Sequence, residues 1–223
     1  MPGPSIGDNY RRIRDALPSG VALLVAAKGR TADEVAEVIG AGARMVGHNL
    51  VQEAEQMRAR LGAAGGAVEW HLIGHLQRNK VNRALPLFDV IQSVDSARLA
   101  RALGERAGRP VRAYVEVNVG GEESKSGVSP EDAHRLVAEI AALPGICVEG
   151  LMTVEPYCED PDAARPFFRR MRSVFEELKG RGLPNVRMDV LSMGMTHSYG
   201  VAVEEGANMV RIGTAIFGPR QGA

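Results

Sequence analysis

The chain has 223 residues, and its 27 basic and 27 acidic residues cancel to a net charge of zero. No long run of one sign interrupts this balance, so the composition does not indicate a nucleic-acid or anionic-membrane partner. The length suits one large domain, and neither a linker nor a low-complexity tract divides the sequence. We therefore expect a single domain over residues 1–223.

The cysteines and the apolar segments predict in which cellular compartment the protein is found. Cys147 and Cys158 are the two cysteines, and without a second metal-type pair they are interpreted as ordinary reduced thiols. The opening residues lack the apolar core of a secretory leader, and no apolar stretch is long enough to cross a bilayer. We expect a soluble, cytoplasmic protein without a metal site.

Strand-like and helical patterns alternate along the whole chain. Residues 8–17 form an amphipathic segment that predicts an opening helix. Later helix starts are marked by the capping box of Thr31 and Glu34, and by Pro130 in the first turn after Ser129. The eight expected strands are residues 21–27, 45–48, 70–73, 90–94, 112–119, 147–153, 188–192 and 209–212.

This order of elements predicts an α/β fold, a single-domain (β/α)8 TIM barrel with an N-terminal helix. A doubly wound open sheet would give a similar alternation, but the count of eight strands favours a closed barrel. In such a barrel the active residues occupy the carboxyl ends of the strands, and the loops after strands seven and eight often hold a phosphate.

Lys28 ends the first apolar run, which is bounded by Gly20 and Gly29. At the end of a strand buried on both faces, desolvation would penalise the charge of its ammonium group. A neutral amine forms Schiff bases with aldehydes, and pyridoxal 5′-phosphate (PLP) is the commonest aldehyde that protein lysines hold. The alternative interpretation is a surface lysine that snorkels from the strand end.

Two small, donor-rich turns follow the seventh and eighth strands, at residues 192–196 and 211–214. Gly194 lets backbone N–H groups approach an anion closely, and the two hydroxyls of its turn can donate to phosphate oxygens, so the two turns together predict a phosphate cup. Arg211 shares a strand face with Gly213, and its guanidinium can only donate hydrogen bonds. Against a pyridine nitrogen it would keep that nitrogen unprotonated and restrain PLP chemistry. An ion pair at the barrel rim is the alternative for this arginine.

His71 and His75 stand four residues apart, which in a helix would suggest a metal pair. Gly74 lies between them, and the first half of the segment has a strand pattern. No carboxylate in the zincin arrangement accompanies them, so we interpret His71 as a residue that lines or satisfies the core.

These residues lie in longer motifs that resemble one family over nearly the entire chain. The motifs are residues 25–28, 47–53, 70–80, 117–127, 150–153, 191–195 and 209–218. On these motifs the chain is similar to the pyridoxal phosphate homeostasis proteins (the YggS/PROSC family). The resemblance implies a fold-type III PLP-binding barrel like the N-terminal domain of alanine racemase.

The resemblance also implies roles for particular residues. PLP would be bound as a Schiff base to Lys28, with Arg211 at the ring nitrogen and Asn49 and Met152 near the ring. The phosphate would be held by Ser192, Met193, Gly194, Gly213 and Thr214. The implied function is intracellular PLP homeostasis by a non-catalytic, monomeric protein, with PLP and PLP-dependent apoenzymes as partners.

Two enzymatic functions stay open as alternatives: a PLP-dependent amino-acid racemase and a Schiff-base phosphosugar lyase. Racemisation needs a second acid–base group, which related racemases take from an extra β domain that we do not find in this sequence. The position of Lys28 on strand one speaks against the lyase. The chain departs from the family at His48, where the family usually has glutamate, and at residues 196–199, where an acidic dipeptide is usual.

Overall fold

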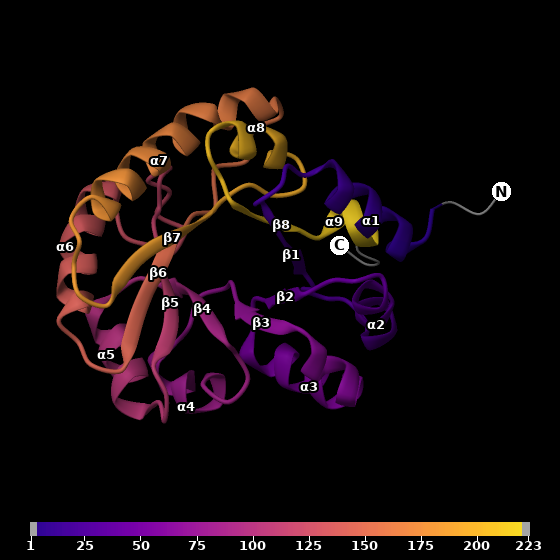
Figure 1. Ribbon diagram of the computed structural model, residues 1–223, viewed down its shortest axis with the longest axis horizontal. Coiled ribbons are helices and arrows are strands. Elements are labelled where there is room, and N and C mark those ends of the chain that lie inside the picture. The colour runs from indigo at the N-terminus through magenta and orange to yellow at the C-terminus, as the bar shows by residue number, and fades with distance from the viewer. Residues whose placement is uncertain (1–3, 220–223) are drawn as a thin grey trace.

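The computed structural model describes residues 4–219, and its eight strands form one closed parallel barrel in chain order (Figure 1). The strands are β1 (Ala22–Ala26), β2 (Met45–His48), β3 (Glu69–Leu72), β4 (Val90–Val94), β5 (Val111–Glu116), β6 (Ile146–Met152), β7 (Val186–Ser192) and β8 (Met209–Ile212). The prediction of a (β/α)8 barrel is confirmed, and the open-sheet alternative is wrong because β8 pairs with β1.

Helices surround the barrel, and their caps follow the sequence signals. The Thr31 hydroxyl accepts a hydrogen bond from the Glu34 backbone N–H, and the Thr31 backbone N–H donates to the Glu34 carboxylate, which completes a capping box. Ser129 caps the helix that begins at Pro130. The helices are α1 (Ile6–Ala16), α2 (Ala32–Gly40), α3 (Val51–Leu61), α4 (Val81–Ala84), α5 (Ala97–Arg106), α6 (Pro130–Ala141), α7 (Arg165–Lys179), α8 (Tyr199–Glu204) and α9 (Thr214–Phe217). Among the described residues, none of these helices has the length and apolarity needed to cross a bilayer.

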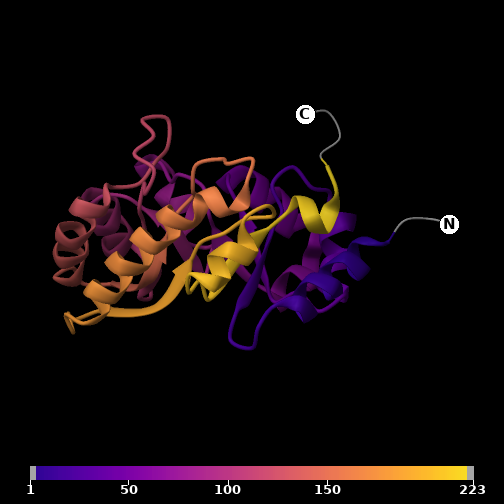
Figure 2. The same cartoon turned by 90° about the horizontal axis from the view of Figure 1, so that it is seen from above.

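The opening helix packs beside the last one. Figures 1 and 2 both show α1 next to α9, and the Asn9 side-chain amide donates to the Ile216 carbonyl at 3.1 Å. Figure 2 also shows these two helices on one flank of the molecule. The segment before β1 and the segment after β8 therefore brace the same side of the barrel.

Two apolar layers share the strands. Val25 and Val46 belong to the large core between strands and helices. The opposite faces of the strands fill the barrel interior with Leu24, Val90, Tyr114, Met152 and Met209. Strands buried on both faces account for the near-continuous apolar runs in the sequence.

The alternation of strand residues decides which side chains reach the mouth, by which we mean the end of the barrel at the carboxyl ends of the strands. Leu24 and Met209 line the interior, so Arg211, two residues after Met209, lies on the same face. Lys28 and Gly213 then follow the ends of the neighbouring strands β1 and β8. The fold thus brings together at one end residues that are far apart in the sequence.

Candidate functional site

Lys28 lies at the mouth in the turn after β1. The Ala27 N–H still donates to the Gly47 carbonyl at 2.9 Å, but the chain then turns through Gly29, which has a φ of 68°. Lys28 is exposed as a result. The predicted desolvation of its ammonium group is therefore wrong, because strand pairing ends before the lysine. Its amine is accessible from solvent.

Arg211 is the buried cation of the mouth, with 4% of its surface exposed. Its Nη1 donates to the Ser192 hydroxyl at 2.8 Å and its Nη2 donates to the Thr153 carbonyl at 2.6 Å. Burial lowers the pKa of Arg211, and the nearby Glu155 and Glu116 carboxylates oppose that shift. The alternative of a rim ion pair does not describe this arginine, which is buried in the barrel and held by neutral acceptors.

Glu116 is a mouth residue that the sequence analysis did not single out. It is 8% exposed at the end of β5 and follows Tyr114, which lines the interior, by two residues. Burial and the Asp95 carboxylate raise the pKa of Glu116 to about 7, while Arg211 opposes the rise. A carboxyl group whose pKa is raised toward neutral pH can give or take a proton at the mouth. Its only sequence signal is a carboxylate inside an apolar strand run.

The turns after β7 and β8 lie side by side. The Ala215 N–H donates to the Thr196 hydroxyl at 3.2 Å and so ties the two turns together. A Cβ at Gly213 would stand 2.9 Å from the Ala26 carbonyl oxygen, so the glycine lets the β8 turn pack against β1. The predicted cup is therefore adjacent to the strand that ends before Lys28.

The cup has backbone donors to offer. Gly194 is buried and has a φ of 89°, a conformation that residues with a side chain rarely adopt. Within residues 4–219, the backbone N–H groups of Gly194, Gly213 and Thr214 donate to no acceptor. Successive unpaired N–H groups of this kind suit an anion such as a phosphate.

Four other predicted site residues have different surroundings. Asn49 is half-buried in the loop after β2, and Met152 is fully buried in the barrel interior. Ser192 accepts from Arg211 and donates to the Gln92 side chain at 2.8 Å, so its hydroxyl proton is already used. Met193 packs its side chain into the outer core, and its N–H donates to the Met209 carbonyl at 3.1 Å.

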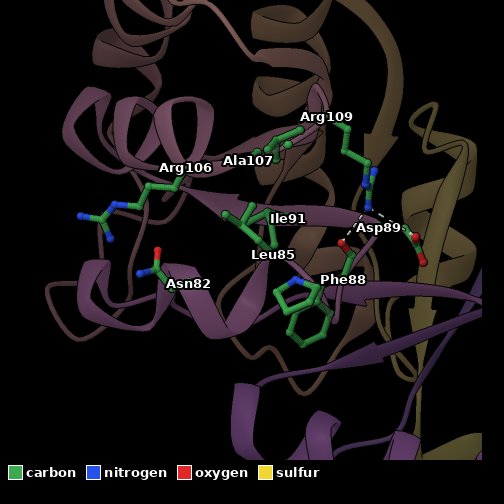
Figure 3. Close-up of a pocket in the computed structure, with 11 residues that line it drawn as sticks. Asn82, Leu85, Phe88, Asp89, Ile91, Arg106, Ala107 and Arg109 are labelled. Carbon is green, nitrogen blue, oxygen red and sulfur yellow. Dashed lines mark hydrogen bonds and ion pairs between the residues drawn. The ribbon is translucent and has the colours of Figure 1, made fainter.

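A cavity of about 350 Å³ lies at the opposite end of the barrel, where β4 and β5 begin (Figure 3). Phe88 and Ile91 contribute apolar wall, and Arg109 lies 3.6 Å from the Asp89 carboxylate at its edge. This cavity is separate from the mouth because Lys28 and the cup follow the other ends of the strands.

Comparison with known proteins places the chain in a family. The family described as "Alanine racemase, N-terminal domain" matches residues 4–221. A pyridoxal phosphate homeostasis protein of Aquifex aeolicus is 41% identical over 202 residues, which are 89% of this chain and 87% of that protein. The chain belongs to the pyridoxal phosphate homeostasis protein family.

Solved structures agree with this family and with its barrel. PipY of Synechococcus elongatus, solved with PLP bound, has a TM-score of 0.87 at 32% identity, and the match covers 96% of this chain and all of PipY. Alanine racemase of Corynebacterium glutamicum has a TM-score of 0.80 at 20% identity, over 96% of this chain and 61% of the racemase. The likeness to the racemase shows a shared fold.

His48, where the sequence analysis noted a departure from the family, is the last residue of β2, and its side chain faces the outer core and not the barrel interior. Its ring is 1% exposed and stacks on Trp70 with 5.6 Å between the ring centroids. It lines a cavity of about 160 Å³ shared with Glu53 of α3. Burial lowers the pKa of His48 to about 4. The folded protein therefore holds this imidazole neutral.

We expect His48 to make stability depend on pH. Its pKa is about 4 in the folded protein against an ordinary 6.5, so the unfolded chain binds more protons as the pH falls between these values. The free energy of unfolding therefore decreases as the pH falls from about 6.5 to about 4. In urea unfolding at pH 7 and pH 5, the wild type should lose about 2 kcal/mol more than His48→Leu. Equal losses in both proteins would contradict a buried neutral imidazole, and a comparison at pH 8 and pH 7 serves as the control.

Proposed function

We propose that the protein binds PLP covalently through Lys28 and keeps it available inside the cell without catalysing a reaction. The observation that supports this most strongly is the meeting, at one end of the barrel, of an exposed amine, a buried guanidinium and a cup of unpaired N–H groups. The family supports it too, because relatives are named pyridoxal phosphate homeostasis proteins and PipY was solved with PLP bound.

The residues at the mouth fit the functional groups of PLP. When bound, PLP supplies an aldehyde that an amine attacks and a pyridine ring that withdraws electrons. The exposed amine of Lys28 is the nucleophile, and the N–H groups of Gly194, Gly213 and Thr214 suit the phosphate. Arg211 would face the pyridine nitrogen, and its fixed charge would prevent that nitrogen from gaining a proton.

The same residues support the proposed non-catalytic role. A guanidinium at the pyridine nitrogen weakens the ring as an electron sink, so the arrangement favours holding the ligand over transforming it. The racemase and phosphosugar lyase alternatives are not favoured by the family. An assay of the PLP-loaded protein with L-alanine tests this part, and we expect no conversion to D-alanine above the rate with free PLP.

The binding itself is tested by adding PLP to the purified protein and recording absorption spectra. We expect a new band that saturates at about one PLP per chain. A spectrum equal to the sum of free PLP and protein at every concentration would contradict the proposal.

The cellular role forms a further part of the proposal. We propose a cytoplasmic monomer in which the whole chain, residues 1–223, serves as one PLP-binding domain and passes PLP to PLP-dependent apoenzymes. Reactivation of an apoenzyme by the loaded protein tests this, with free PLP kept low by a scavenging phosphatase. Reactivation no faster than in the scavenged buffer would argue against transfer.

Thr214→Val tests the phosphate cup. Thr214 is exposed at the first position of α9, and valine keeps its shape while removing the hydroxyl. Loss of one hydrogen bond to a charged phosphate should weaken PLP binding about tenfold without preventing attachment to Lys28. Pyridoxal, which lacks the phosphate, should bind both proteins equally well. Unchanged PLP affinity would remove Thr214 from the site.

A further inference from the structure

Polar side chains form a continuous hydrogen-bonded chain through the barrel interior. It starts at the mouth, where Arg211 Nη1 donates to Ser192 Oγ at 2.8 Å. The Ser192 hydroxyl donates to Gln92 Oε1 at 2.8 Å, and Gln92 Nε2 lies 2.8 Å from His71 Nδ1. His71 Nε2 then lies 2.7 Å from Glu69 Oε1. Five residues from four strands thus connect the two ends of the barrel.

This hydrogen-bonded chain of side chains ends in charged groups at the base, by which we mean the end of the barrel where the strands begin. Glu69 also pairs with Arg112, whose Nε donates to Glu149 at 2.8 Å. The hydrogen bonds from His71 and Arg112 lower the pKa of Glu69 to about 2, so its carboxyl group is ionised. The base therefore provides a fixed anion at one end, and Arg211 provides a fixed cation at the other.

The three side chains in the middle of this hydrogen-bonded chain are fully buried. Ser192, Gln92 and His71 are each 0% exposed, and they lie among the apolar side chains that fill the barrel, such as Leu24 and Met152. Polar groups in such surroundings are costly unless each finds a partner. Apolar residues at positions 71, 92 and 192 together would avoid that cost, so the polar side chains call for an explanation beyond core filling.

The two charged ends determine which atom donates and which accepts in every hydrogen bond between them. Arg211 can only donate, so Ser192 accepts from it and must give its own proton to the Gln92 oxygen. The Gln92 nitrogen then donates to His71 Nδ1, which leaves the His71 proton on Nε2, where it faces the Glu69 carboxylate. Turning the Gln92 amide over would leave the Ser192 proton without this acceptor. One arrangement therefore satisfies the whole chain.

We propose that Ser192, Gln92 and His71 act together as positioning residues for Arg211, holding its guanidinium in one orientation at the mouth before any ligand arrives. This inference rests on the proposed function, since the orientation of Arg211 matters because it would face the ring nitrogen of PLP. The chain anchors one Nη group, and the Thr153 carbonyl anchors the other at 2.6 Å. Without the hydrogen bonds from Ser192, Gln92 and His71, only the Thr153 carbonyl would hold the guanidinium.

The first test uses the protein without PLP. In ¹⁵N-labelled protein, NMR measures how fast the Arg211 side-chain N–H groups exchange with water. Gln92→Leu removes both hydrogen bonds at the centre of the chain, and we expect exchange to become at least about tenfold faster. Gln92→Glu keeps an acceptor for the Ser192 hydroxyl, so it should restore slow exchange.

The second test uses bound PLP. Gln92→Leu should weaken PLP binding and move the pH dependence of the bound-PLP absorption. The matched control is Val90→Ala, because Val90 pairs with His71 in the strand register and its side chain makes no hydrogen bond. Both variants should lose thermal stability, but only Gln92→Leu should change the exchange and the absorption.

The outcomes separate this inference from the proposed function. Equal Arg211 exchange in the wild type and Gln92→Leu would overturn the positioning role, whatever happens with PLP. If Gln92→Leu does not fold, Ser192→Ala breaks the link next to Arg211 with a smaller change and has the same expected result. A wild type that takes up no PLP would end the proposed function, while the exchange data would still decide the positioning role.

Discussion

Lys28→Ala is expected to abolish covalent PLP attachment completely and to leave the fold intact. The amine is the nucleophile that the proposed adduct requires, so no adduct can form at position 28 without it. Lys28 is exposed in a turn and packs into neither apolar layer, so we expect the thermal midpoint to stay within about 2 °C of the wild type. Absorption spectra with added PLP and a thermal melt check the two parts.

Lys125→Ala is the matched control for this experiment. Lys125 also lies near the mouth, where its Nζ donates to the Glu155 carbonyl at 2.9 Å. The Lys125→Ala variant should keep the absorption band of bound PLP. The same band in Lys28→Ala, or gross unfolding of that variant, would contradict the position and the role given to Lys28.

Gly194→Ala is expected to destabilise the protein by about 3 kcal/mol and to weaken PLP binding. Gly194 has a φ of 89°, and an added Cβ would stand 2.5 Å from the Ala202 Cβ and 3.1 Å from the Tyr199 Cα. The turn after β7 would therefore have to move away from α8, and the N–H groups of the cup would move with it. Urea unfolding measures the first effect, and PLP titration measures the second.

Gly200→Ala supplies the control for Gly194→Ala within the same segment. Gly200 is inside α8, and an added Cβ there would meet nothing within 4 Å. Because alanine favours a helix more than glycine does, this variant should gain about 0.5–1 kcal/mol. Similar losses in both variants would show that the close packing at Gly194 is not the cause.

The strands could be predicted because parallel strands buried on both faces have almost continuous apolar runs. The start of β3 could not be predicted in the same way. Its first residue is Glu69, whose charge is compensated in the fold by His71 and by Arg112 of β5. A pairing partner more than forty positions away leaves no mark on the local pattern.

The sequence predicted which candidate residues meet at the mouth, as far as strand ends and turn chemistry decide it. Lys28, Arg211 and the two glycine turns come together at the mouth because each follows or ends a strand of one barrel. The burial expected for Lys28 was wrong because it depends on the residue at which strand pairing stops. Glu116 and Gln92 were missed because their roles depend on side chains from other strands, such as Ser192, which is 100 positions from Gln92.

Peptide mass mapping after borohydride reduction of the PLP-treated wild type decides whether Lys28 binds PLP covalently. The chain has four lysines, Lys28, Lys80, Lys125 and Lys179, so proteolysis can assign the modified side chain without ambiguity. We predict that the reduced PLP mass is found on the peptide that contains Lys28. PLP found on another lysine, or on none, would rule out Lys28 as the attachment site.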